Sequence, residues 1–160
     1  MTHDRTGEDG RALKLTLVGT FLASIAVAGR QASGRESARD PLDLVLMGLA
    51  SYRIGRMVAF ERVGEPLREH FTAEVPDESG VDDTVVARGR GPRWVIGELL
   101  SCPTCIATWA ALGLSIGSAV LPGPIRMLTN VLAAAGVAEI ANGGVEHLEW
   151  SARAARARAK

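Results

Sequence analysis

The longest stretch without a charge constrains this chain most. It contains 27 consecutive uncharged residues, from Leu99 to Ile125. A helix needs about 20 apolar residues to cross the hydrocarbon core of a bilayer, which is roughly 30 Å thick. A helix that begins at Pro103 and stops before Pro122 has 19 residues and a length of about 28 Å. The stretch therefore predicts a transmembrane helix.

Charge is segregated along the whole chain. The composition includes 22% charged residues with zero formal net charge. The charges crowd into residues 1–14, 30–41, 61–93 and 146–160, with nearly charge-free runs between them. Such alternation is typical of membrane proteins with polar loops, and 160 residues suit one compact unit. We therefore expect an all-α integral membrane bundle with three to four transmembrane helices and a short interfacial helix.

Residues 1–30 contain the first apolar run, Leu15–Gly29, which has two interpretations. Its 15 uncharged residues are fewer than a span needs, but snorkelling of Lys14 and Arg30 would lengthen it into a retained transmembrane helix. A basic flank, an apolar centre and the small-residue ending Ala26-Val27-Ala28 also fit a cleaved secretory signal. An N-terminal segment of one of these two kinds is expected.

The second run, Leu42–Phe60, begins at Asp40-Pro41, which is a typical helix start. It contains Arg53 and Arg56, which are three residues apart and share a helix face. Both lie within about two turns of the charged segment that follows, so anchoring at the membrane interface is one interpretation. The other is that they form ion pairs with a carboxylate such as Glu98, or bind an anionic headgroup.

Residues 61–93 form the largest polar segment. Glu65–Phe71 fits a short surface helix with Pro66 in its first turn. Pro76–Gly91 is acidic and then rich in Arg and Gly, which is typical of a flexible linker. The next residues, Trp94–Leu100, are expected to form an amphipathic helical turn at the membrane surface.

Small residues mark the last two apolar runs. Gly113 and Gly117 are four residues apart, a spacing that allows close contact with another helix. The fourth run, Ile125–Ala141, is followed by Asn142-Gly143-Gly144, which predicts the end of its helix. We therefore expect two helices that pack through small side chains.

The tail, residues 142–160, carries four cations and no acid after Glu149. Cationic segments beside a span tend to stay in the cytoplasm and bind anionic headgroups. With four spans and both termini inside, twelve basic residues lie inside and four outside. This places both termini on the cytoplasmic side of a bacterial cell membrane, with the lipid bilayer as partner, a homo-oligomer as an option and no nucleic acid. The four cations are Arg153, Arg156, Arg158 and Lys160.

Cys102-Pro103-Thr104-Cys105 marks the start of the predicted helix. Proline is favoured at the first helical position, so Cys102 is expected to cap the helix and Cys105 to be its third residue. Backbone N–H groups and the helix dipole favour a thiolate there. Three interpretations stay open: free thiols that pack, a redox-active disulfide, and half of a zinc site completed by a histidine or a second chain. No other cofactor is indicated.

Three segments of the chain resemble a bacterial membrane protein family. They are Leu49-Ala50-Ser51-Tyr52-Arg53-Ile54-Gly55-Arg56, then Glu65-Pro66-Leu67-Arg68, and then Gly97-Glu98-Leu99-Leu100-Ser101-Cys102-Pro103-Thr104-Cys105 with Trp109. With them, residues 42–141 are similar to domain of unknown function 1360, a family that includes a sporulation-associated protein of bacilli. The resemblance implies an integral membrane protein without an established activity, with the first helix and the tail as additions.

Taken together, these features favour a structural or assembly factor of the bacterial envelope, and the resemblance implies a link to development or sporulation. An enzyme is less expected, because no Ser-His-Asp grouping and no cofactor-binding loop stands out. A membrane thiol protein that uses Cys102 and Cys105 for redox exchange or metal binding is the first alternative. A holin-like small pore, suggested by the chain's size and small-residue helices, is the second.

Overall fold

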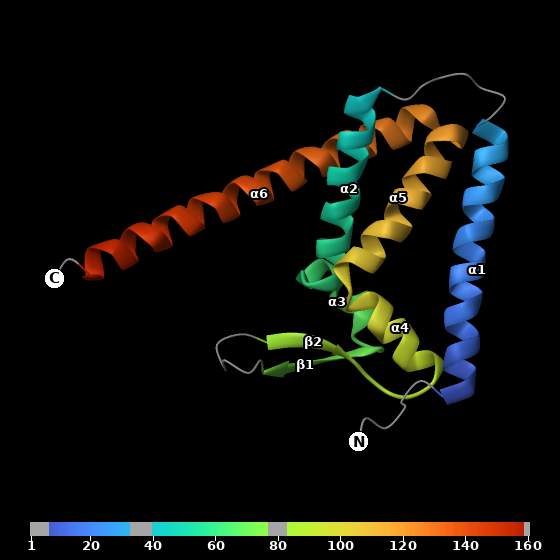
Figure 1. Cartoon of the computed structure of the whole chain (residues 1–160), viewed down its shortest axis with the longest axis horizontal. Coiled ribbons are helices and arrows are strands. Elements are labelled where there is room, and N and C mark those ends of the chain that lie inside the picture. The colour runs from blue at the N-terminus through green and yellow to red at the C-terminus, as the bar shows by residue number, and fades with distance from the viewer. Residues whose placement is uncertain (1–6, 33–39, 77–82, 159–160) are drawn as a thin grey trace.

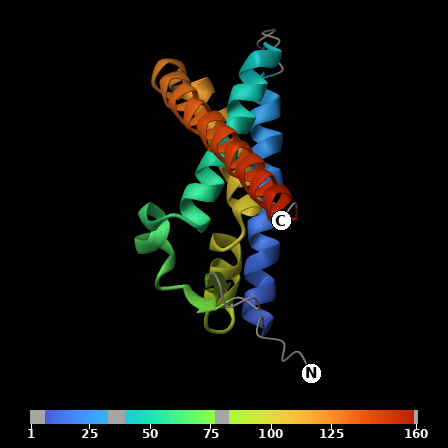
Figure 2. The same cartoon turned by 90° about the vertical axis from the view of Figure 1, so that its left-hand side faces the viewer.

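Long helices dominate the computed structural model, which describes residues 7–32, 40–76 and 83–158. Three of them, α1 (Gly7–Ala32), α2 (Pro41–Ala59) and α5 (Pro103–Val120), run along one another, with α5 between the other two (Figure 1). The fourth, α6 (Pro122–Arg158), starts where α5 ends and then projects away from this bundle (Figures 1 and 2).

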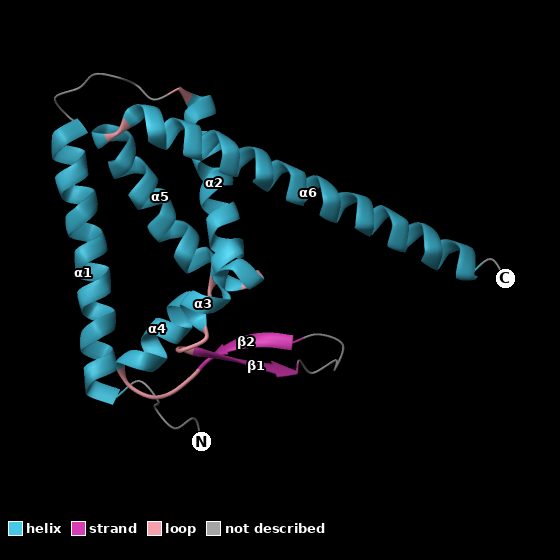
Figure 3. Ribbon diagram, turned by 180° about the vertical axis from the view of Figure 1, so that it is seen from behind, coloured by secondary structure: helices cyan, strands magenta, loops and turns pink. Residues whose placement is uncertain are grey.

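The short elements gather at the end of the bundle where α1 begins (Figure 3). Here α2 passes into a 3-10 turn and a one-turn helix, and the chain then forms a two-stranded antiparallel hairpin before α4 leads into α5. In this hairpin Thr72 pairs with Ala87 and Pro76 with Asp83. The bounds are Arg62–Gly64 for the 3-10 turn, α3 Glu65–Arg68, β1 Thr72–Pro76, β2 Asp83–Ala87 and α4 Pro92–Leu100.

The prediction of a flexible linker over Pro76–Gly91 is wrong, because part of this segment forms β2. The strands are rich in β-branched residues, as in Thr84-Val85-Val86, and such residues favour strands. An isolated two-stranded hairpin is marginal in water. This one packs against α4, where Gly97 lies so close to Phe71 and Ala87 that no side chain fits between them.

The predicted helix starts are confirmed. The Asp40 side chain accepts a hydrogen bond from the Leu42 backbone N–H at 3.0 Å, and Pro41 occupies the first turn of α2. At α5 the helix begins at Pro103 with Cys102 as its cap. Pro92 likewise opens α4, so the helical turn expected over Trp94–Leu100 is present as a nine-residue helix.

The predicted helix end at Asn142-Gly143-Gly144 is wrong, because α6 continues through it for a total of 37 residues. A glycine inside a helix costs about 1 kcal/mol relative to alanine, but neighbouring side chains bridge this stretch. Asn142 donates a hydrogen bond across the two glycines to Glu146 at 2.9 Å, and further along the helix Arg153 pairs with Glu149 at 3.1 Å. The border expected between a membrane domain and a tail, at 141/142, therefore falls inside one helix of about 55 Å.

Within the described residues, three helices are long and apolar enough to cross a membrane: α1, α5 and α6. Helix α2, the other apolar run of the sequence, is not among them. Many large apolar side chains of these three helices face outward, for example Leu22, Val120 and Val131, which are 59%, 68% and 59% exposed. The expectation of a mostly helical fold is thus confirmed, with a hairpin in addition.

Helix α2 packs against both α5 and α6 and provides most of the core. Ala50 of α2, Leu114 of α5 and Ala133 of α6 form one buried cluster. Contact with α6 is close because Gly136 lies against the backbone carbonyl of Leu49, where an added Cβ would come within 3.0 Å of the oxygen. Small side chains on both helices therefore set the distance between them.

Candidate functional site

The Cys-Pro-Thr-Cys motif lies at the start of α5, as the sequence predicts. Cys102 has extended backbone angles (φ −103°, ψ 101°), and its sulfur accepts a hydrogen bond from the Cys105 backbone N–H at 3.3 Å. The two cysteines are joined as a disulfide, with Cα atoms 5.3 Å apart. Cys105 is exposed and Cys102 half-buried. In this state neither sulfur is a free thiol.

Metal ligands do not converge on this motif among the described residues. No group of three or more His, Cys, Asp or Glu side chains there could hold a metal ion. His3, one of the histidines available to the zinc interpretation, lies outside the described part of the chain. A small cavity of about 160 Å³ is lined by Asp43, Met47 and Thr129, among others. It is well below the volume of ordinary small-molecule sites.

The motif docks on α2 through a glycine. A Cβ built at Gly55 would overlap the carbonyl oxygen of Pro103 and would lie 3.1 Å from the Cβ of Ala107. Gly55 is buried, and it stands between Arg53 and Arg56 in the sequence of α2. The cysteine motif is therefore held against the same turn of α2 that carries the two arginines.

Four charged side chains next to this contact form what we call the arginine–glutamate cluster: Arg53, Arg56, Glu61 and Glu139. Arg53 donates to Glu61, with one contact at 3.1 Å, and to Glu139 at 3.3 Å. Arg56 pairs with the other oxygen of Glu139. Glu139 thus bridges both arginines and ties α6 to the last turns of α2.

Arg56 also contacts aromatic rings on its own helix. Its guanidinium lies 6.0 Å from the ring centroid of Tyr52 and 5.5 Å from that of Phe60. Cations are attracted to the faces of aromatic rings at such distances. These contacts and Glu139 together fix the orientation of the arginine.

Glu98, which the sequence suggested as a partner for the arginines, is placed elsewhere. Its carboxylate pairs with Lys14 of α1 at 2.6 Å. A second contact between α1 and the rest of the chain is the edge-to-face packing of Phe21 on Trp109, with ring centroids 5.2 Å apart. Glu98 therefore belongs to the docking of α1, and Glu61 and Glu139 take the role proposed for it.

The two glycines expected to mediate helix packing differ in their surroundings. A Cβ added at Gly117 would lie 3.1 Å from the side chain of Ile125, at the start of α6. Gly113 has no neighbour within 4 Å of that position and is exposed. The close backbone contacts of α5 and α6 with α2 instead occur at Gly55 and Gly136.

Arg68 completes this end of the bundle. Its side chain is only 4% exposed, and it donates to three backbone carbonyls at the end of α2. The acceptors are Val58 at 3.3 Å, Phe60 at 3.4 Å and Glu61 at 2.6 Å. The last carbonyls of a helix have no partner within the helix, so Arg68 supplies hydrogen-bond donors at the end of α2.

Sequence reasoning missed Glu139, Glu61 and the role of Arg68. Glu139 is the only charged residue between Ile125 and Ala141 apart from Arg126. A single carboxylate near the end of an apolar run is a signal, because ionisable groups in such runs are usually paired. Glu61 is the first acid after α2, within two turns of Arg53.

Replacing Glu139 tests the cluster. Glu139→Gln leaves Arg53 and Arg56, whose side chains are 20% and 42% exposed, without their shared carboxylate. We expect a loss of about 1–2 kcal/mol in the free energy of unfolding, less than for a fully buried pair. Glu149→Gln is the matched control on the same helix, because its pair with Arg153 is 59–69% exposed, and it should cost under about 0.5 kcal/mol. Equal losses in detergent unfolding would contradict the bridging role.

Comparisons with known proteins converge on one family. A family model described as "Protein of unknown function (DUF1360)" matches residues 46–145, close to the range expected from the sequence. "Sporulation protein YjcA" of Bacillus subtilis (strain 168) is 37% identical over 102 residues, which is 62% of this chain and 86% of the relative. "UPF0713 protein YngL" of the same organism is 30% identical over 102 residues, covering 62% of this chain and 75% of the relative. No solved structure matches.

The matched range contains the features that form the site. Gly55, the arginine–glutamate cluster, Arg68 and the cysteine motif all lie within residues 46–145. The whole of α1, the first turn of α2 and the end of α6 lie outside it. The chain therefore belongs to the DUF1360 family of proteins of unknown function.

Proposed function

We propose that the chain is an integral membrane protein with a structural or assembly role in the bacterial envelope. In this arrangement α1, α5 and α6 cross the bilayer, and α2, which packs between α5 and α6, crosses it with them. The observation that carries the proposal is the outward-facing apolar surface of the three helices. Water-soluble monomers rarely expose large apolar patches, whereas lipid covers such a surface without cost. Between its two ends, a helix satisfies its backbone groups internally, as the bilayer requires.

The hairpin end of the bundle is assigned to the cytoplasm. This end carries the start of α1, the hairpin and the cysteine motif (Figure 3), and the basic residues of the sequence favour that side. Helix α4, with Trp94 in its first turns, would lie at the interface. The N-terminal segment 1–30, the domain 42–141 and the tail 142–160 then form one multi-pass protein with both termini in the cytoplasm of the bacterial cell.

Membrane placement is tested by topology mapping on the full chain. Alkaline phosphatase fused after residue 36 should be active, and green fluorescent protein fused after residue 80 or at the C-terminus should fluoresce, because the first reports the outside and the second the cytoplasm. The protein should also resist extraction by alkaline carbonate. Extraction into the soluble fraction would contradict the membrane placement. The reverse fusion pattern would contradict the proposed orientation.

The role in envelope assembly rests on packing and on a relative. The site consists of contacts that hold helices together, and the Bacillus subtilis relative is named a sporulation protein. Deleting the gene from its own bacterium should impair the envelope during development and leave vegetative growth normal. Normal development in the deletion strain would remove the assembly role.

A second candidate function is thiol–disulfide exchange, which the disulfide at the exposed start of α5 favours. A thiolate of an external dithiol would attack the exposed Cys105 sulfur, and the S–S electron pair would leave on Cys102. The Cys105 backbone N–H stabilises that thiolate as it does the sulfur now, 3.3 Å away. In the resulting mixed disulfide, the partner's second thiolate attacks the partner's own sulfur and releases Cys105 as a thiolate. The partner is thereby oxidised to a disulfide, and this chain is reduced to a dithiol.

Differential alkylation tests this candidate. Disulfides rarely persist in the cytoplasm, so a cytoplasmic Cys102–Cys105 pair should be reduced in growing cells and re-form in purified protein exposed to a disulfide oxidant. Mass spectrometry should show two alkyl groups in the first sample and none in the second. Cys102→Ser with Cys105→Ser gives the functional control. A pair that never changes state, or a double variant that fully replaces the wild type in cells, would rule the exchange function out.

A further inference from the structure

The part of α6 beyond the bundle, residues 142–158, is covered by no other element in the described part of the chain (Figures 1 and 2). We call it the distal α6 segment. All of its residues are exposed except Ala152, which is half-buried. Val145, Leu148 and Trp150 are 54%, 68% and 72% exposed. Isolated helices of this length are marginal in water, so this segment needs a partner surface.

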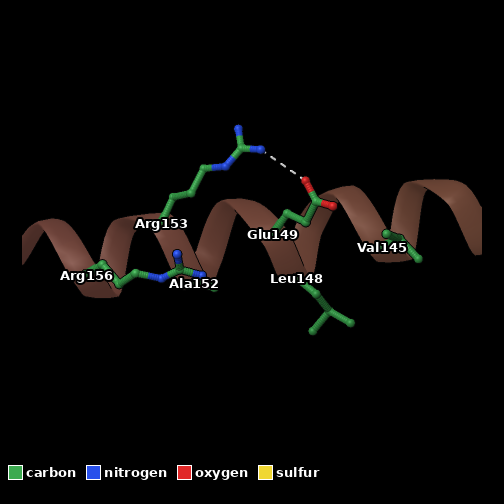
Figure 4. A pocket seen from close by; sticks show the side chains of 6 residues that line it. All are labelled: Val145, Leu148, Glu149, Ala152, Arg153 and Arg156. Atoms are coloured by element: carbon green, nitrogen blue, oxygen red, sulfur yellow. Dashed lines mark hydrogen bonds and ion pairs between the residues drawn. The ribbon is translucent and has the colours of Figure 1, made fainter.

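The face of the distal α6 segment combines apolar and cationic groups. Figure 4 shows Val145 and Leu148 on the same helix as Arg153 and Arg156, together lining a shallow hollow. No acid follows Glu149 in the sequence, whereas three described arginines do. Arginines close to an anionic membrane surface are attracted to its headgroups, and tryptophan favours the membrane interface.

The position of the segment relative to the bundle follows from the arginine–glutamate cluster. Glu139 contacts Arg53 and Arg56, near the point where α2 ends at Ala59 and the polar segment begins. The distal α6 segment starts less than one turn beyond Glu139 on the same continuous helix. It therefore leaves the bundle at the level where polar residues replace apolar ones.

We propose that the distal α6 segment binds the anionic phospholipid headgroups of the membrane that holds the bundle. Arg153, Arg156 and Arg158 contact phosphate groups, and Val145 and Leu148 contact the acyl boundary beneath them. The inference rests on the proposed membrane placement. An anionic lipid surface complements the three arginines that follow Glu149.

Hydrogen exchange of the full chain in nanodiscs tests this. Backbone amides of residues 142–158 should exchange more slowly in phosphatidylglycerol than in phosphatidylcholine, by roughly a hundredfold for three cations. The variant R153Q/R156Q/R158Q should lose this difference. The matched control R62Q/R88Q/R90Q removes three exposed arginines outside α6 and should keep it.

The outcomes separate this proposal from the membrane placement itself. Slow exchange of α5 amides in both lipids shows that the bundle is inserted, and fast exchange there would defeat the placement. With α5 protected, equal exchange of residues 142–158 in the two lipids overturns headgroup binding. Protection that requires two copies per nanodisc overturns it as well and assigns the surface to a second chain.

Discussion

Gly55→Ala should destabilise the protein by about 3 kcal/mol, although it adds a single methyl group. The new Cβ would overlap the carbonyl oxygen of Pro103 and press on the Cβ of Ala107 at 3.1 Å. The backbone at Pro103 cannot rotate away from the new methyl group as a long side chain could, so α2 and α5 must move apart. Overpacking of this kind costs about 1–3 kcal/mol and sometimes more. The measurement is the free energy of unfolding in detergent micelles.

Gly48→Ala provides the matched control for this prediction. Gly48 lies on the same helix, and nothing stands within 4 Å of its added Cβ. Alanine is the better helix former by about 1 kcal/mol, so this variant should be as stable as the wild type or more so. If Gly55→Ala behaved like Gly48→Ala, the docking of the cysteine motif on α2 would be wrong.

Arg68→Met should cost about 2–4 kcal/mol and loosen the hairpin end of the bundle. The substitution keeps an unbranched apolar side chain but removes the guanidinium donors to the carbonyls of Val58, Phe60 and Glu61. Of these, the Glu61 carbonyl keeps the Gly64 backbone N–H at 3.0 Å. Hydrogen bonds from a charged donor are worth about 1.5–3 kcal/mol, and an acceptor left buried without a partner adds its own penalty. The loss should appear in thermal unfolding and as faster amide exchange at the end of α2.

Arg62→Met is the control for Arg68, because Arg62 is exposed in the adjacent 3-10 turn. Removing this cation should change stability by under about 0.5 kcal/mol. If both variants lost the same stability, the effect would come from general charge and not from the helix end. If the amides at the end of α2 stayed protected from exchange in Arg68→Met, water would be donating to the carbonyls in place of the guanidinium.

Local signals in the sequence were enough to predict where helices begin. Asp40-Pro41 and Cys102-Pro103 each combine a capping side chain with a proline of suitable backbone angle, and such signals act over a few residues. The apolar runs predicted the helices for the same reason. These features depend little on what the rest of the chain does.

Most of the features that were missed depend on distant partners, and the continuation of α6 is the local exception. Gly143 and Gly144 would end a helix in many contexts, but α6 continues because side chains on both sides of them bond to each other. The spacing of Gly113 and Gly117 predicts close packing without naming the partner, and the closest contacts formed at other glycines. Glu139 meets Arg53 across 86 positions of sequence, a distance over which no local pattern carries information.

The position of α2 has a consequence for synthesis. It packs against both α5 and α6 and provides most of the core, yet it is not among the three described helices apolar enough to cross a membrane alone. Its arginines meet their bridging carboxylate only after another 83 to 86 residues have been made, which takes roughly 4–17 s at bacterial or slower translation rates. During that interval α2 would have to wait at the insertion machinery or at the membrane surface, and it would enter the bilayer together with α6.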